Sequence, residues 1–169
     1  MSTTNETLPI HTISVYVANK PGVLARIAQV FARRGYNIES LVVSPAIDGH
    51  FSRMTIGLSG SPSGLGQIIH NVNKLIDVIT CIDHTDDTSV IRELALIKIR
   101  CAPGQRTEVL QVAEHFGCKT VDLTETSLIV MATGASDKVD ACVKMMRQYD
   151  VVELVRTGKV VMARGETPT

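Results

Sequence analysis

The sequence contains no tryptophan and only three phenylalanines and three tyrosines, so aromatic residues make up 4% of the chain. A surface on which single-stranded RNA or DNA bases stack needs more aromatic side chains than this. Neither sign of charge is in excess, because 17 basic residues balance 17 acidic ones. No overall field therefore attracts the chain to nucleic acid or to an anionic membrane, and we expect neither as a partner.

The four cysteines form no Cys-x-x-Cys pair, and no apolar stretch near the N-terminus resembles a signal peptide. These absences argue against secretion and against a disulfide framework. No apolar run approaches the roughly 20 residues that span a bilayer. We therefore predict a cytoplasmic protein whose thiols are buried or inert.

The hydrophobic pattern predicts the same order of elements in each half of the chain: strand, helix, strand, strand, helix, strand. The expected elements of the first half are a strand around 13–17, a helix from 21, strands 37–45 and 50–59, a helix around 65–76 and a strand at 78–83. Those of the second half are 93–101, 105–116, 119–123, 127–133, 137–147 and 151–156.

An internal duplication explains this parallel order. Shifting the chain by 82 positions places Pro21-Gly22 on Pro103-Gly104 and Gly35 on Gly117. We predict an α+β protein with two ferredoxin-like βαββαβ sandwich domains in tandem, each with two helices on one face of an antiparallel sheet. The expected domains are residues 1–87 and 88–169, joined near the polar stretch 86–89.

The first predicted helix begins in a way that suits an anionic ligand. The first turn of a helix has unpaired backbone N–H groups and a partial positive charge. Pro21 fits the first helical position, and Gly22 would let a carboxylate approach the amides of Gly22, Val23 and Leu24. Asn19 and Asn37 would lie close by if the first two strands were neighbours, and either amide could orient an ammonium or a carboxylate.

A purely structural explanation is also open for these residues. Asn19 could simply end its strand and cap the helix, while Gly35 could be an ordinary helix exit. Pro-Gly is a common corner in proteins. The local chemistry thus permits a ligand site without requiring one.

Longer segments carry a resemblance to a known family. ANKPGVLARIAQVFARRGYNIESL, followed by SRMTI at 52–56 and NKLIDV at 73–78, resembles the regulatory small subunits of acetolactate synthase, also called acetohydroxyacid synthase. The first half is similar to an ACT domain, a ligand-binding module of amino-acid metabolism. The resemblance extends over nearly the whole chain and includes Arg156-Thr157-Gly158 in the second half.

The resemblance implies a non-catalytic subunit that activates a separate catalytic large subunit and confers feedback inhibition by valine in branched-chain amino-acid biosynthesis. It implies a homodimer formed through the ACT domains, with valine bound between two of them. One chain would contribute Asn19, Gly22, Val23 and Leu24, and its partner would contribute Asn37 and Ile38. Thiamine diphosphate, FAD and magnesium would belong to the catalytic partner, and this chain would carry no cofactor or metal.

The second half departs from this pattern at two of those positions. The counterpart of Asn19 is Cys101, and the counterpart of Asn37 is Lys119. We therefore predict that the second domain keeps the Pro-Gly corner but does not bind valine.

Other functions have weaker support in the sequence. A free-standing ACT-type amino-acid sensor acting on another target would show the same motif. An acylphosphatase-like enzyme would need an arginine in the loop after the first strand, where Lys20 is the only cation, and no Ser, Cys or Lys stands beside an evident general base. The acidic stretch from Asp83 to Asp87 is expected to be a solvated linker and not a metal site.

Overall fold

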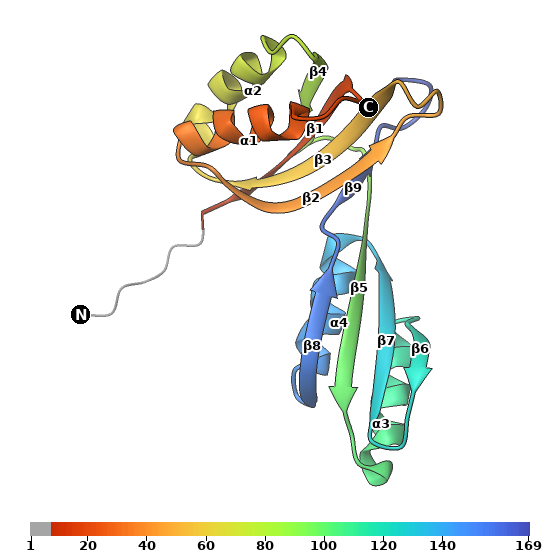
Figure 1. Cartoon of the computed structure of the whole chain (residues 1–169). Helices are drawn as coiled ribbons and strands as arrows, with labels where there is room; N and C mark the ends of the chain where they lie inside the picture. Colours follow the sequence, from red (N-terminus) through yellow and green to blue (C-terminus); the bar gives the residue numbers. More distant parts are fainter. Residues whose placement is uncertain (1–7) are drawn as a thin grey trace, which may run out of the picture. The chain divides into compact units, whose positions relative to one another are not determined.

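The computed structural model of the chain describes residues 8–169, which form two compact units (Figure 1). The first unit comprises the described part of Met1–Val90 together with Lys159–Thr169, and the second comprises Ile91–Gly158. Each unit has its own hydrophobic core.

The first unit has the predicted βαββαβ order. Its elements are β1 (Ile10–Ala18), α1 (Val23–Arg33), β2 (Asn37–Pro45), β3 (Phe51–Ser59), a short 3-10 turn η1 (Pro62–Gly64), α2 (Leu65–Asn73) and β4 (Val78–Asp83). The strands form an antiparallel sheet in the order β2-β3-β1-β4. Both helices cover one face of this sheet (Figure 1).

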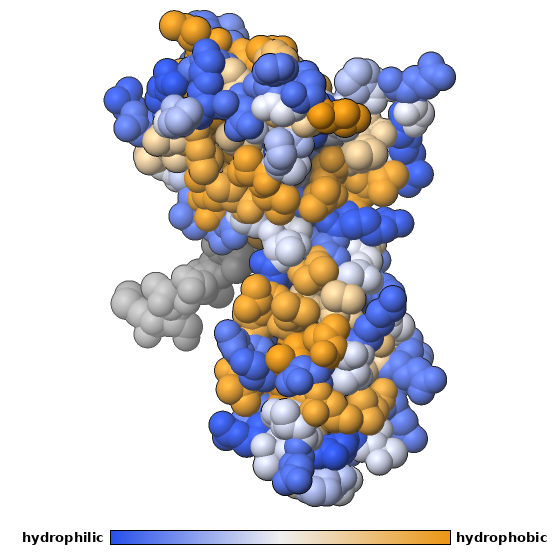
Figure 2. All heavy atoms as spheres, turned by 45° about the vertical axis from the view of Figure 1, so that its right-hand side comes forward, coloured by the Kyte–Doolittle hydropathy of each residue, from blue (hydrophilic) through white to orange (hydrophobic). Residues whose placement is uncertain are grey.

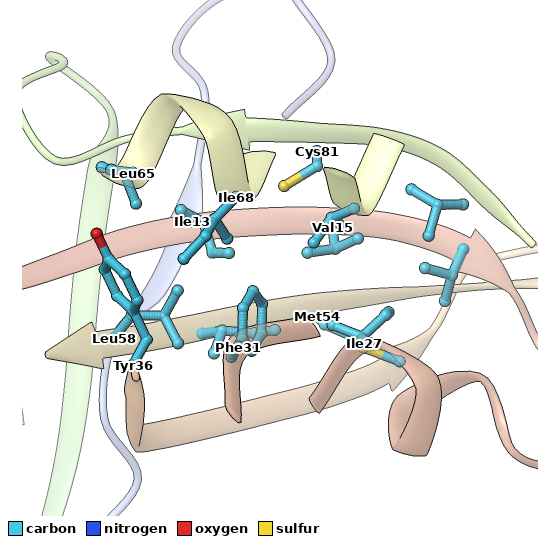
Figure 3. Packing of buried hydrophobic residues seen from close by; sticks show 14 of the residues in the cluster. Ile13, Val15, Ile27, Phe31, Tyr36, Met54, Leu58, Leu65, Ile68 and Cys81 are labelled. Carbon is cyan, nitrogen blue, oxygen red and sulfur yellow. The ribbon is translucent and has the colours of Figure 1, made fainter. Parts of the chain in front are cut away.

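Periodic burial explains why these residues form these elements. Ile13, Val15 and Val17 of β1 are fully buried on the strand face that packs against the helices, and Ser14 on the opposite face is buried as well. Ile27 and Phe31 lie four positions apart on α1 and are also fully buried. They pack between the helix and the sheet, together with Ile68 of α2 (Figure 3).

The second unit repeats this topology. Its elements are β5 (Val90–Arg100), α3 (Pro103–His115), β6 (Lys119–Leu123), β7 (Ser127–Gly134), α4 (Ser136–Met146) and β8 (Asp150–Arg156). The order of its antiparallel sheet, β6-β7-β5-β8, is that of the first sheet with each strand replaced by its counterpart. The structure thus confirms two tandem ferredoxin-like domains.

The end of the chain belongs to the first unit, whereas the predicted second domain ran to residue 169. The short strand β9 (Val160–Met162) pairs with β5, which begins at Val90. Val161 is only 3% exposed. Arg164 Nε donates a hydrogen bond to the carbonyl of Thr88 at 2.7 Å, and Arg53 donates one to the carbonyl of Thr169. The bonds from Arg164 to Thr88 and from Arg53 to Thr169 join Lys159–Thr169 to the first unit.

Candidate functional site

The start of α1 has an unusual backbone conformation. Gly22 is the N-cap residue and has a left-handed φ of 83°, so the helix begins at Val23. The expectation that Pro21 occupies the first helical position is therefore wrong, because Pro21 precedes the N-cap. A Cβ atom added to Gly22 would meet nothing within 4 Å. Glycine is thus favoured here by backbone conformation and not by lack of space.

Backbone N–H groups at the start of α1 are available to a ligand. The amide of Arg26 donates to the carbonyl of Gly22 at 3.2 Å, which is the first bond of the helical series. The helix has no side-chain cap and no acidic residue in its first turn. The amides that precede Arg26 therefore lack helical partners and carry the positive end of the helix dipole.

Two cations stand near this helix start, but a carboxylate already binds them. Arg26 lies 2.7 Å from Asp77, and Lys20 lies 3.4 Å from the same side chain. A hollow of about 190 Å³ lies beside this cluster, lined by Val23, Arg26 and residues 74–78. Of the six predicted site residues, only Val23 lines this hollow.

Asn19 connects the end of β1 to the β2–β3 turn. Its side-chain Nδ2 donates to the carbonyl of Gly49 at 3.1 Å, and its backbone N–H donates to the carbonyl of His50 at 2.9 Å. The side chain does not cap α1. Because Asn19 remains exposed, its amide oxygen can still face a ligand beside the helix start.

The structure separates the two predicted asparagines within one chain. Strand β3 lies between β1 and β2, so the expectation that β1 and β2 are neighbours is wrong. Ala18, which precedes Asn19, pairs with the first residue of β3, whereas Asn37 pairs with the last. At about 3.3 Å per residue, these ends of β3 are about 26 Å apart. One small ligand can contact both asparagines only if they come from two chains.

Glu39 is a polar group of this region that the sequence reasoning missed. Asn37 Nδ2 donates to its carboxylate at 2.8 Å, and Ser59 Oγ also donates to it. The bonds from Ser59 and Asn37 hold the pKa of Glu39 below its usual value of 4.5. The spacing Asn37-x-Glu39 on a strand could have revealed it, because alternate strand residues share a face. The exposed carboxylate can attract an ammonium group.

The three predicted apolar contacts differ in the surface that they offer. Val23 is 3% exposed and belongs to the core, while Ile38 is half-buried and packs against that core. Leu24 is 36% exposed. Leu24 therefore presents the most side-chain surface of the three to a ligand.

The corresponding corner of the second unit has a different backbone conformation and a different link to its hairpin. Helix α3 begins at Pro103, with Ala102 as its N-cap, so Gly104 lies inside the first helical turn. Arg106 donates to the carbonyls of Thr124 and Glu125 and so ties the helix start to the β6–β7 turn. The prediction that the second domain keeps the same Pro-Gly corner is wrong. Pro103 and Gly104 match Pro21 and Gly22 in sequence, but they lie inside the helix, whereas Pro21 and Gly22 precede it.

The stretch expected to be a solvated linker contains a buried histidine. His84 is 3% exposed, and its Nε2 lies 2.8 Å from Ser14 Oγ while its Nδ1 contacts the Asp87 carboxylate. This order of groups resembles a hydrolase relay, which the sequence did not reveal. Ser14 is only 2% exposed, however, so a substrate cannot reach its hydroxyl. We interpret the cluster as a polar link between β1 and the segment after β4.

Residues 8–169 lack two kinds of feature. No group of three His, Cys, Asp or Glu side chains is placed to hold a metal ion. No helix there is both long and apolar enough to cross a membrane.

The outer sheet face of the second unit carries apolar side chains. Leu96, Ile129 and Val155 line a hollow of about 190 Å³, beside the ion pair of Lys98 and Glu153 at 2.7 Å. Val155 is 53% exposed. Figure 2 shows apolar residues gathered on the visible surface of this unit and of the first one.

Both halves of the chain match families of known proteins. Residues 13–80 match the family described as the AHAS small subunit-like ACT domain, and residues 92–165 match the family described as the small subunit of acetolactate synthase. These matches agree with the resemblance found in the sequence motifs.

Individual relatives extend this similarity over nearly the full length. The chain is 47% identical over 155 residues to a probable acetolactate synthase small subunit of Archaeoglobus fulgidus, covering 92% of this chain and 97% of that one. It is 43% identical over 157 residues to the acetolactate synthase small subunit of Mycolicibacterium smegmatis, covering 93% and 92%. The crystal structure of the small subunit from Thermotoga maritima superposes with a TM-score of 0.82 at 35% identity, covering 95% of this chain and 100% of that chain.

Proposed function

Since the chain belongs to the family of acetolactate synthase small subunits, we propose that it is a non-catalytic regulatory subunit in branched-chain amino-acid synthesis. In this proposal it raises the activity of a catalytic large subunit and makes that activity sensitive to valine. Thiamine diphosphate, FAD and magnesium belong to the catalytic partner.

The observation that carries the valine site is the open start of α1. The amides after Gly22 can receive the carboxylate of valine, because they lack helical partners and the helix has no side-chain cap. The corresponding corner of the second unit is tied to its hairpin by Arg106. The proposed site therefore belongs to the first unit only.

The positions of the two asparagines support a site shared by two chains. Asn37 lies at the far end of β3 from Asn19 within one protomer. In a homodimer of ACT domains, a two-fold axis can place Asn37 and Ile38 of one protomer beside Asn19, Gly22, Val23 and Leu24 of its partner. Strand β2 is an edge strand of its sheet, and exposed edges favour such pairing.

The chemistry of valine matches the groups assembled in this way. Its carboxylate would face the amides of α1, and its ammonium would face the Glu39 carboxylate and the amide oxygen of Asn37. Its branched side chain would contact Leu24 and the exposed part of Ile38. Each protomer would supply only part of this site, so the complete site would form only in the dimer.

Valine changes enzyme activity only if it binds two states of the assembly unequally. We propose that it binds more tightly to the dimer arrangement that holds the catalytic subunit in its less active form. Coupling of this kind is typically about 1–3 kcal/mol. Inhibition at saturating valine is then partial or strong, depending on where the equilibrium lies without valine.

The outer sheet face of the second unit is our candidate for contact with the catalytic subunit. Apolar patches on a surface commonly mark protein interfaces, and Leu96, Ile129 and Val155 form such a patch beside a charged pair. Placing a glutamate at Val155 should weaken activation without changing valine binding. If activation were unchanged, this face would not be the contact with the catalytic subunit.

Reconstitution tests the proposed function directly. The catalytic subunit is assayed alone, with this chain, and with this chain plus valine. We expect a higher rate on adding the chain and a lower rate on adding valine, while the catalytic subunit alone does not respond to valine. If the chain neither stimulated the enzyme nor formed a complex with it, the proposal would be wrong.

A further inference from the structure

Two cysteine side chains from different elements are in direct contact in the second unit. Cys118 Sγ and Cys142 Sγ lie 3.4 Å apart. All four cysteines of the chain are free thiols. Among the described residues, this is the one pair of sulfurs that contact each other. The sequence predicted that all four thiols are buried or inert, partly because the cysteines form no Cys-x-x-Cys pair.

The backbone fixes both partners in place. Cys118 follows Gly117, whose left-handed φ of 64° ends α3, and the Cys118 N–H donates to the carbonyl of Ala113 at 2.8 Å. Cys142 lies within α4 and is 1% exposed. A backbone hydrogen bond holds Cys118 in the short connection between α3 and β6, and Cys142 lies within a helix, so the contact is a property of the folded unit.

The two thiols differ in their access to solvent. Cys118 is half-buried at the edge of the core, whereas Cys142 lies inside it. Burial, followed by the hydrogen bond to Cys118, raises the pKa of Cys142 to about 12, and the positive charge of Lys138 opposes this rise. A soluble oxidant therefore reaches Cys118 first, while Cys142 remains a protonated thiol within reach.

We infer that Cys118 and Cys142 form a reversible redox site that closes to an intramolecular disulfide under peroxide. The Cys118 thiolate attacks hydrogen peroxide, forming an S–O bond and releasing hydroxide, which leaves a sulfenic acid. The Cys142 sulfur then attacks Cys118, forming the S–S bond. The sulfenic oxygen leaves as water with the Cys142 proton. Peroxide is reduced, and the two thiols are oxidised.

The bond would link the residue that precedes β6 to α4. The cross-link would close a loop in the unfolded chain and so stabilise the second unit against unfolding. Disulfides in reducing compartments are commonly transient sensors, and a thiol reductant should restore the open pair. This inference does not depend on the proposed regulatory function.

Peptide mapping of the full-length protein after mild hydrogen peroxide treatment tests the site. We expect one linked pair of peptides, containing Cys118 and Cys142, that has lost two hydrogen atoms and separates on reduction. Cys118→Ser should abolish the linked pair, whereas Cys81→Ser and Cys101→Ser should retain it. Peptide mapping of the parent protein tests the site by itself, even if one of the variants folds poorly.

Other results would overturn the inference. These are recovery of Cys118 as sulfinic acid beside an unmodified Cys142 thiol, linkage to another cysteine, or links between two molecules only. Thermal unfolding adds an independent readout, since the oxidised protein should unfold at a higher temperature than the reduced one. A lower temperature would mean that the native packing does not accommodate the bond.

Discussion

Replacing Gly22 with aspartate places a negative charge where the carboxylate of valine is proposed to bind. Gly22 precedes the free amides of α1, and a new Cβ there would meet no atom within 4 Å. The fold should therefore accept the side chain sterically. The left-handed φ of 83° is a mild strain for aspartate, which tolerates this region better than most residues.

The size of the effect follows from Coulomb repulsion between two carboxylates. At about 4 Å and an effective dielectric constant of about 20, the repulsion is about 4 kcal/mol. Because the site is open to solvent, we discount this by half, to about 2 kcal/mol. The valine concentration that gives half inhibition should then rise by about thirtyfold. Activation of the catalytic subunit should change little, because the substitution leaves the second unit intact.

Two matched variants separate charge from conformation. Gly22→Asn introduces a side chain of the same size as aspartate, which must adopt the same left-handed backbone conformation but carries no charge. It should therefore raise the half-inhibitory valine concentration far less than Gly22→Asp. Gly104→Asp adds the same charge at the aligned Pro-Gly, where it should leave valine inhibition unchanged. The assay is acetolactate formation by the reconstituted enzyme over a series of valine concentrations. Full valine sensitivity of Gly22→Asp would refute the placement of the carboxylate at α1.

Three further predictions concern the partner side of the site, the core and the acid response. Asn37→Ala should weaken valine inhibition, whereas Lys119→Ala, its counterpart in the second unit, should not; calorimetric titration of both variants with valine checks this, and equal loss would contradict it. Phe31→Ala removes a fully buried ring and should lower the free energy of unfolding by about 3–5 kcal/mol, measured by urea denaturation; a loss below 1 kcal/mol, roughly, would mean that the core collapses around the gap. Glu39 has a lowered pKa, so its stabilising contribution is complete above its usual pKa of 4.5 and is lost as the pH falls through the folded-state value. Glu39→Gln should reduce that acid-induced loss, and identical urea midpoints for variant and parent across this range would count against the hydrogen bonds of Glu39.

The glycines show how far sequence reasoning reaches. Gly35 and Gly117 were paired by the internal repeat, and both have left-handed φ angles at the ends of their helices. Gly22 and Gly104 were paired by the same offset, yet only Gly22 has a positive φ. A helix end places a local demand on one residue, whereas the helix start is tied to its neighbouring hairpin by Asn19 in one unit and by Arg106 in the other.

Long-range arrangement explains the other differences. Periodicity identified β1 and β2 as strands, but it carries no information about which strand lies between them. The pairing of β3 with both strands therefore separated residues that had been expected to lie together. The sequence also did not reveal the buried cluster of His84, because His84 contacts Ser14, which lies 70 residues earlier in the chain.

Because Lys159–Thr169 belongs to the first unit, that unit cannot finish folding before the second unit has been synthesised. Domains generally fold from the N-terminus as a chain is synthesised. Here the unit that is synthesised first still lacks the contact between Arg53 and Thr169 and the hydrogen bond from Arg164 to Thr88 until residues 159–169 emerge. A ribosome-bound chain thus carries an unfinished N-terminal unit until residues 159–169 have been synthesised and have left the ribosome.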